Sequence, residues 1–248
     1  ATLADLFLLQ SLPYLLLLLP LVWLIVRAAP WRQPARQWRN DGRRGMELGL
    51  ANLFTGGVMM AVPPFAMHVG GSRYAALFGL LMTLLSVLML LPRAISLQMI
   101  PQLARHREAA ATLQMLLEQA RSRLWGLSGV AVFALSSAWV VMAHRSVHWM
   151  FGVPGSSAIA LLLISYLAIS QLSIVSSNVL QVFEDTGFIF SVNGAYVLLV
   201  LLAAGLLLLA PLGGLQRLLG LLLAINLLTV VRTALFEIKS RRLVGGVS

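Results

Sequence analysis

The chain has 248 residues, of which 59% are hydrophobic and only 10% are charged, whereas a soluble domain carries roughly 25% charged residues. This composition, together with a mean hydropathy of +0.89, excludes a soluble protein, so the net charge of +10 is interpreted by its position relative to lipid. The absence of cysteine excludes disulfides and thiolate metal sites. The sequence starts ATLADLF, without methionine, and we expect a fragment or a processed chain.

Seven apolar runs are each long enough to cross the hydrocarbon core as a helix, which takes about 20 residues. The runs are continuously apolar and rich in leucine, unlike the alternating strands of a membrane barrel, so the predicted fold is an all-α integral membrane protein. In chain order the predicted spans cover 3–26, 47–69, 75–100, 124–143, 157–180, 188–210 and 218–236.

The basic residues fall mainly in one set of the connections between these spans. Three residues lie in the other set, namely Arg73, Arg145 and Arg217. This asymmetry predicts an outside N-terminus and a cytoplasmic C-terminus. The stretch RQPARQWRNDGRRG, residues 32–45, is then a cytoplasmic loop that marks topology and can contact anionic lipid head groups. The larger set comprises Arg27, Arg32, Arg36, Arg39, Arg43, Arg44, Arg105, Arg107, Arg121, Arg123, Arg232, Lys239, Arg241 and Arg242.

Prolines mark the first three spans, and each removes a backbone hydrogen bond and bends or breaks its helix. Such kinks serve packing, or they surround a moving gate in transporters. The segment that follows the last of them, about 101–123, has apolar residues at helical spacing among charged ones, which predicts an interfacial helix leading into the fourth span. The prolines are Pro13, Pro20, Pro63, Pro64, Pro92 and Pro101.

Polar side chains at helical spacing mark one face of the fifth span, and two more lie beside it. Two interpretations stay open, namely hydrogen-bonded helix packing and the wall of a hydrated pathway. The face consists of Tyr166, Ser170, Ser173, Ser177 and Gln181, and its neighbours are Gln171 and Asn178.

Arg93, next to Pro92, is the one strong charge that stands out within an apolar run. A charged side chain near the bilayer centre costs several kcal/mol and usually faces protein or water. The alternative is that Arg93 extends along the helix to the cytoplasmic interface. Asn52, Asn193 and Asn226 are further intramembrane polar groups with the same two interpretations.

Signals for covalent chemistry and for bound cofactors are weak. His144 and His148 have the spacing of two metal ligands on a helix, but no nearby carboxylate or cysteine completes a site. Glu184 and Asp185 are adjacent in a short turn and make a poor acid/base pair. No nucleotide-binding glycine motif occurs. We therefore expect a protein that is not an enzyme and that holds no metal or cofactor.

Three short motifs follow one another along the chain. A short outside loop leads into SRYAALFG at 72–79, a proline precedes a basic helix in IPQLARHRE at 100–108, and MFGVPGSSA at 150–158 precedes a helix rich in small residues. A turn and a helix containing Asn193-Gly194 follow after one span. Over about residues 45–242 this order resembles the polysaccharide and O-antigen flippases of the multidrug/oligosaccharidyl-lipid/polysaccharide exporter superfamily.

The resemblance implies that six of the about seven predicted transmembrane helices form one lobe of a two-lobe transporter. Residues 1–26 would be the last helix of the first lobe, whose remainder is missing, and 27–46 the basic cytoplasmic linker. The second lobe would cover 47–236, with the interfacial helix at about 101–123, and 237–248 would be a cytoplasmic tail.

The resemblance further implies a flippase that moves a lipid-linked oligosaccharide of the polyprenyl-pyrophosphate type across the bacterial inner membrane by alternating access. Its partners would be that substrate, membrane lipids and the polysaccharide polymerase machinery, and no nucleic acid. The alternatives are a multidrug exporter of the same superfamily and a membrane-embedded polysaccharide-assembly enzyme or subunit. The expected substrate cavity is lined by Arg93, Asn52, Tyr166, Ser170, Gln171, Ser173, Ser177, Asn178 and Asn193.

Overall fold

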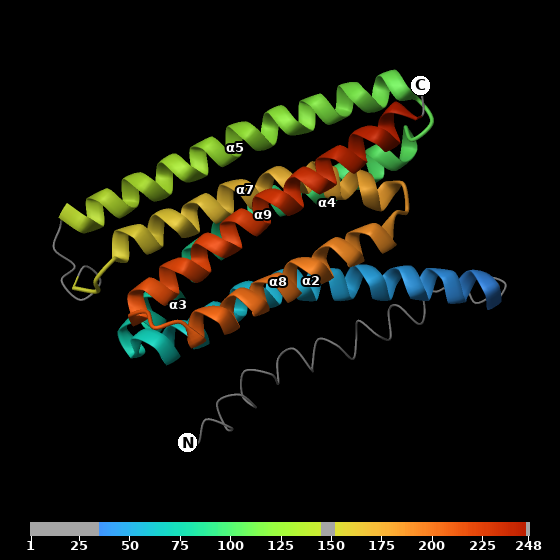
Figure 1. The fold of residues 1–248 in the computed structure, drawn as a ribbon. Helices are drawn as coiled ribbons and strands as arrows, with labels where there is room; N and C mark the ends of the chain where they lie inside the picture. Colours follow the sequence, from blue (N-terminus) through green and yellow to red (C-terminus); the bar gives the residue numbers. More distant parts are fainter. Residues whose placement is uncertain (1–34, 145–151, 247–248) are drawn as a thin grey trace, which may run out of the picture. The chain divides into compact units, whose positions relative to one another are not determined.

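The computed structural model describes residues 35–144 and 152–246, so the predicted first span, 3–26, lies outside the described residues. The described ranges consist mainly of helices and contain no strand, which confirms the predicted all-α fold. The helices are α2 (Ala35–Gly70), α3 (Ser72–Leu88), α4 (Leu90–Arg105), α5 (Ala110–His144), α7 (Ser156–Val182), α8 (Thr186–Leu209) and α9 (Gly214–Gly245) (Figure 1).

Five of these helices are long and apolar enough to cross a membrane, and they correspond to five of the predicted spans. α2, α5, α7, α8 and α9 contain the predicted spans 47–69, 124–143, 157–180, 188–210 and 218–236 almost entirely. The outer face of α8 carries exposed leucines such as Leu198, Leu202 and Leu209. Large apolar side chains on the outside of a helix suit contact with lipid.

The predicted third span, 75–100, is divided into α3 and α4 by a turn at Met89. The reason is Pro92, which has no N–H to donate to the carbonyl of Leu88 and whose ring crowds that carbonyl. The other prolines within the described helices have a smaller effect, since α2 continues through Pro63 and Pro64 and α4 through Pro101.

The predicted separate interfacial helix at 101–123 is not found in that form. α4 ends at Arg105, a turn follows, and α5 runs from Ala110 to His144 as one helix. The apolar residues that suggested an interfacial helix, Leu113 and Leu117 among them, are buried against Leu103 of α4 and Val179 of α7. Protein rather than lipid covers this stripe, so the helix has no reason to bend into the interface.

The chain divides into two compact units, Ala1–Arg43 and Arg44–Ser248. Only 35–43, the first turns of α2, is described in the first unit. All contacts discussed below lie within the second unit.

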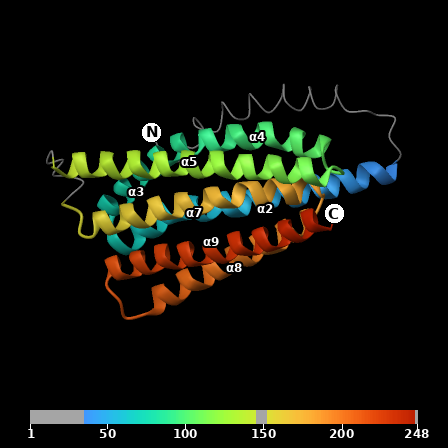
Figure 2. The ribbon, with the colours of Figure 1, turned by 90° about the horizontal axis from the view of Figure 1, so that it is seen from above.

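α7 is the central helix of the second unit. It packs against α9 on one side and against α5 and α4 on the other, as the view from above shows (Figure 2). One apolar core joins α7 to α2, α3, α8 and α9, with Phe78, Leu163 and Leu218 fully buried. A second core joins α7 to α4 and α5. The polar residues of α7 are therefore placed among protein rather than lipid.

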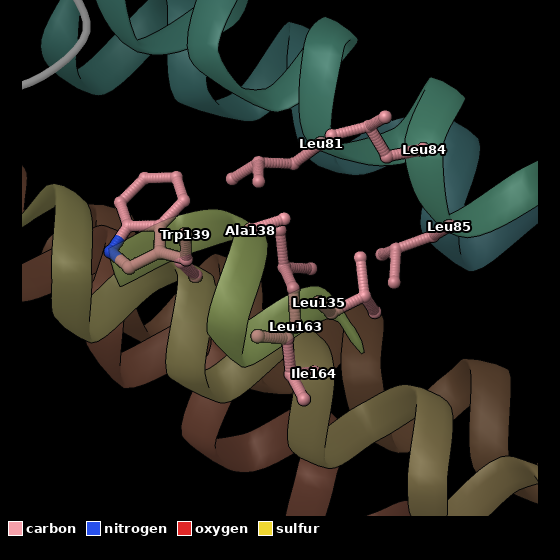
Figure 3. A pocket seen from close by; sticks show the side chains of 9 residues that line it. Leu81, Leu84, Leu85, Leu135, Ala138, Trp139, Leu163 and Ile164 are labelled. Atoms are coloured by element: carbon pink, nitrogen blue, oxygen red, sulfur yellow. The ribbon is translucent and has the colours of Figure 1, made fainter. Parts of the chain in front are cut away.

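A small cavity lies where α3, α5 and α7 meet, lined by Leu81, Leu85, Trp139 and Leu163 among others (Figure 3). Its volume is about 20 Å³ and its lining is apolar. A space of this size holds about one water, and an apolar lining gives that water no partner. It is a packing defect and not a ligand site.

The start of α9 lies against the end of α2, and glycine makes this contact possible. A Cβ on Gly214 would collide with the carbonyl oxygen of Val69. That oxygen is backbone and cannot turn away as a side chain would.

We predict that Gly214→Ala destabilises the protein by about 1–3 kcal/mol, the usual cost of overpacking, and lowers the melting temperature of the purified protein in detergent. Gly205→Ala is the matched control, because a Cβ there meets nothing within 4 Å and alanine favours a helix over glycine by about 1 kcal/mol. Equal melting temperatures for the two variants would contradict the close contact.

Candidate functional site

The polar residues predicted on the fifth span lie inside the unit and point to two different neighbours. Gln171 and Asn178 face α4 and α5, where Gln171 accepts a hydrogen bond from Ser128, and the Oδ1 of Asn178 accepts one from the Oγ of Ser96 at 2.9 Å. Gln171 and Asn178 are both buried. These contacts are interhelical packing, the first of the two interpretations.

The serines of the predicted face bond chiefly within their own helix. Ser170 donates to the carbonyl of Leu167 at 2.9 Å, and Ser173 donates to the carbonyl of Ser170 at 2.7 Å. Ser177 accepts from Gln181 at 3.4 Å. Tyr166, at the other end of the face, packs against the main apolar core. Of these residues, Ser173 also contacts a charged group.

That group is Arg232 of α9. Its Nη2 donates to the Oγ of Ser173 at 3.1 Å. The guanidinium lies over two rings, with its carbon 5.5 Å from the centroid of Tyr196 and 5.6 Å from that of Phe236. Stacking on two aromatic faces and one hydrogen bond fix the plane and position of the cation between α7, α8 and α9.

The charge of Arg232 has no carboxylate partner among the described residues. Its Nε is buried and has no acceptor, and the neighbouring Oγ1 of Thr233 is also buried without a partner. The hydroxyl of Tyr196 accepts a hydrogen bond from Thr229 at 3.3 Å. Arg232 is thus a partly buried cation with an unused N–H group, which makes it the candidate functional residue of this unit.

By its position in the sequence, Arg232 is counted with the basic residues of the cytoplasmic connections and is not included among the candidate site residues. The structure places it within α9, in contact with three other helical residues. The sequence does mark Arg232 as a candidate, because position 232 lies within the predicted span 218–236. A charge inside a predicted span is a functional candidate by default.

The remaining predicted site residues are not gathered around Arg232 by any described contact. Asn52 is exposed on α2. Asn193 is buried on α8, and its Oδ1 has no partner in the described part of the chain. Arg93 lies on α4, but its side chain is outside the described residues.

Ion pairs tie the helices together at one end of the unit, which we call the charged end, formed by the starts of α5 and α8 and the ends of α4, α7 and α9. Glu184, in the turn between α7 and α8, pairs with Arg44 at 2.8 Å and Arg107 at 3.7 Å. Asp185 pairs with Lys239 at 3.1 Å. These side chains are partly exposed, so each pair contributes little to stability.

Glu237 of α9 is the hub of the charged end. Its Oε1 lies 2.7 Å from Arg121 of α5 and 2.7 Å from Arg241, one turn further along α9. Its other oxygen accepts a hydrogen bond from Ser176 of α7. One carboxylate thus links three helices next to the site of Arg232.

No family model matches this chain, and neither does any curated protein or solved structure. The resemblance to the flippases therefore stays a prediction.

Metal ligation finds no support in the described residues, which contain no group of three or more potential His, Cys, Asp or Glu ligands. The proposed pair His144 and His148 extends outside the described residues, because His148 is not among them.

We predict that Glu237→Gln lowers the melting temperature, because two guanidinium groups lose their anionic acceptor. Because Arg121 and Arg241 are partly exposed, each pair is worth about 0.2–1 kcal/mol, which sets the expected loss of stability. Glu118→Gln, on the exposed face of α5, is the control and leaves the melting temperature within experimental error. High salt screens ion pairs and should therefore destabilise the parent relative to Glu237→Gln. If added salt changed the melting temperatures of the parent and of Glu237→Gln equally, loss of the ion pairs would not explain the lower stability of the variant.

Proposed function

We propose that this protein is a membrane transporter that flips a lipid-linked oligosaccharide of the polyprenyl-pyrophosphate type across the bacterial inner membrane for surface polysaccharide biosynthesis. One observation carries the proposal, namely the guanidinium of Arg232, held within a membrane-type helix without a carboxylate partner among the described residues.

The chemistry of that guanidinium favours a phosphate over other anions. Arginine presents a planar set of donors that can hold two phosphate oxygens at once. The rings of Tyr196 and Phe236 keep this plane fixed, so little side-chain entropy is lost when an anion binds. A pyrophosphate group linked to a lipid offers such an anion at the membrane.

The depth of the site suits a head group that enters from the cytoplasmic leaflet. Arg232 precedes the hub residue Glu237 by five positions, which corresponds to about 7.5 Å along a helix. The excess of basic residues in the connections predicts that the charged end is cytoplasmic. A lipid phosphate near that surface then needs to move only a short way inward to meet Arg232.

Alternating access requires helices that can move while the protein stays closed to one side of the membrane. The turn between α3 and α4 at Met89 supplies a break within an otherwise continuous apolar segment, and broken helices commonly surround transport pathways. Transport of this kind needs no covalent chemistry, so the protein is proposed not to be an enzyme. The polysaccharide polymerase machinery is its proposed functional partner.

The alternatives have less support. A multidrug exporter for cations would use an intramembrane carboxylate, whereas Glu184, Asp185 and Glu237 are ion-paired at the charged end. A polysaccharide-assembly enzyme would need a catalytic acid. The described carboxylates in ion pairs with arginine or lysine are poorly placed to donate protons.

We predict that Arg232→Gln, introduced into the full-length gene product in its own host, reduces surface polysaccharide on the order of ten- to a hundredfold at matched membrane levels, because one or two charge-assisted hydrogen bonds are lost. Arg232→Lys is expected to fail as well, because lysine lacks the planar donor set. Lipid-linked sugar should accumulate on the inner leaflet.

Arg123→Gln is the matched control, since Arg123 is exposed on α5 and its loss removes the same charge elsewhere. Normal export by Arg232→Gln would overturn the proposed role of this residue. Loss of export in the control as well would show only a general need for positive charge.

The predicted role of Arg93 is tested in the same assay with Arg93→Lys and Arg93→Ala. Loss of export in both variants is expected if the guanidinium contacts the head group. Full activity in both would exclude a substrate contact, and loss in the alanine variant alone would indicate only a positive charge near the interface.

A further inference from the structure

An apolar groove runs along α2, α8 and α9, with a volume of about 280 Å³. Val58 and Val62 of α2 and Ile225 of α9 are buried in its lining, while Leu53 and Leu201 are more than half exposed at its rim. Gly57 and Ala61 of α2 also line it, and their small side chains leave the space open. The groove is therefore lined by three helices, with exposed leucines at its rim.

One end of the groove lies about two helical turns from Arg232. Val197 lines the groove and follows Tyr196, whose ring lies under the guanidinium. Ile225 lines it from α9, and Arg232 comes seven residues later, which places both on the same face of the helix two turns apart. α2 and α8 approach each other at the rings of Phe54 and Phe190, which lie 5.8 Å apart.

We propose that the groove and Arg232 form one site for a long-chain lipid phosphate, with the phosphate on the guanidinium and the hydrocarbon chain in the groove. The charge and the groove favour the same ligand. The guanidinium attracts an anion, and the apolar lining of the groove suits a hydrocarbon chain because it offers no hydrogen-bond partner to a polar group. The inference rests on the proposed function and adds to it that the lipid chain of the substrate enters the protein.

A chain held in this way has a fixed direction. The groove extends from the level of Val197 toward Ala204 on α8 and from Ile225 toward Leu221 on α9, in both cases away from the charged end. A lipid whose phosphate sits at Arg232 would therefore direct its chain toward the bilayer centre. This is the orientation of a lipid in the leaflet next to the charged end, so binding requires no inversion.

The test uses the full-length protein purified in decyl maltoside, with dodecyl phosphate as the probe. Dodecyl phosphate at a fixed mole fraction in the micelle is expected to raise the melting temperature, because a ligand that binds only the folded state stabilises it. Gly57→Leu fills the groove, and it is expected to weaken binding of dodecyl phosphate about tenfold, which corresponds to roughly two methylene groups losing burial.

Gly56→Leu is the matched control, because Gly56 is exposed outside the groove and a Cβ at either glycine meets nothing within 4 Å. It should respond to dodecyl phosphate as the parent does. Inorganic phosphate, which has no chain, should act equally on both glycine variants. Arg232→Gln should lose the response to both phosphates, and its melting temperature without ligand shows whether it folds.

Equal shifts by dodecyl phosphate in Gly57→Leu and Gly56→Leu would overturn the inference, as would an unchanged shift in Arg232→Gln. Equal stabilisation by added dodecyl maltoside would also overturn it, because the phosphate would then be irrelevant. The proposed function fails separately: if Gly57→Leu blocks dodecyl phosphate but the parent exports no polysaccharide in its host, the lipid-phosphate site stands and the flippase proposal falls.

Discussion

The structure depends on one constraint, which is that a polar group away from water must find its partner within the protein. α7 shows how the sequence meets it. Gln171 and Asn178 bond to α5 and α4, Ser173 and Ser176 meet side chains of α9, and Ser170 bonds to its own backbone. Because these partners come from helices on both sides, α7 has to lie at the centre of the unit. The position of Arg232 follows from this, since its hydrogen-bond acceptor is a serine of the central helix.

Much of the fold could be predicted from the sequence, because hydrophobic length is a local property. A run of about 20 apolar residues specifies a helix without reference to its neighbours, and Pro92 breaks its helix through its own ring. The extent of α5 could not be predicted in this way. Whether Leu113 and Leu117 face lipid head groups or protein depends on α4 and α7, and the sequence of 101–123 is compatible with both.

The sequence predicts only part of the candidate site, because the contacts that form it come from residues on different helices. The helical spacing of Tyr166, Ser170, Ser173 and Ser177 could be read from the sequence, but only the structure shows that Ser173 accepts from an arginine 59 residues away. Arg232 was overlooked because basic residues near the end of a span are usually topological. Its two ring contacts come from different helices, Tyr196 on α8 and Phe236 on α9, so spacing along one helix could not reveal the complete cage.

The arginine site and the charged end are coupled through α9 and α7. Glu237 fixes the end of α9 through Arg121 and Ser176, and Ser176 is three residues from Ser173, so both contacts lie within one turn of α7. A shift of α9 along α7 would have to break the Ser173 and Ser176 contacts together. Glu184, at a positive φ of 60° that glycine would adopt more readily, pairs with Arg44 and Arg107 in the turn that follows α7. The contacts of Arg232 and of Glu237 therefore hold α9 against α7 at neighbouring points of the same two helices.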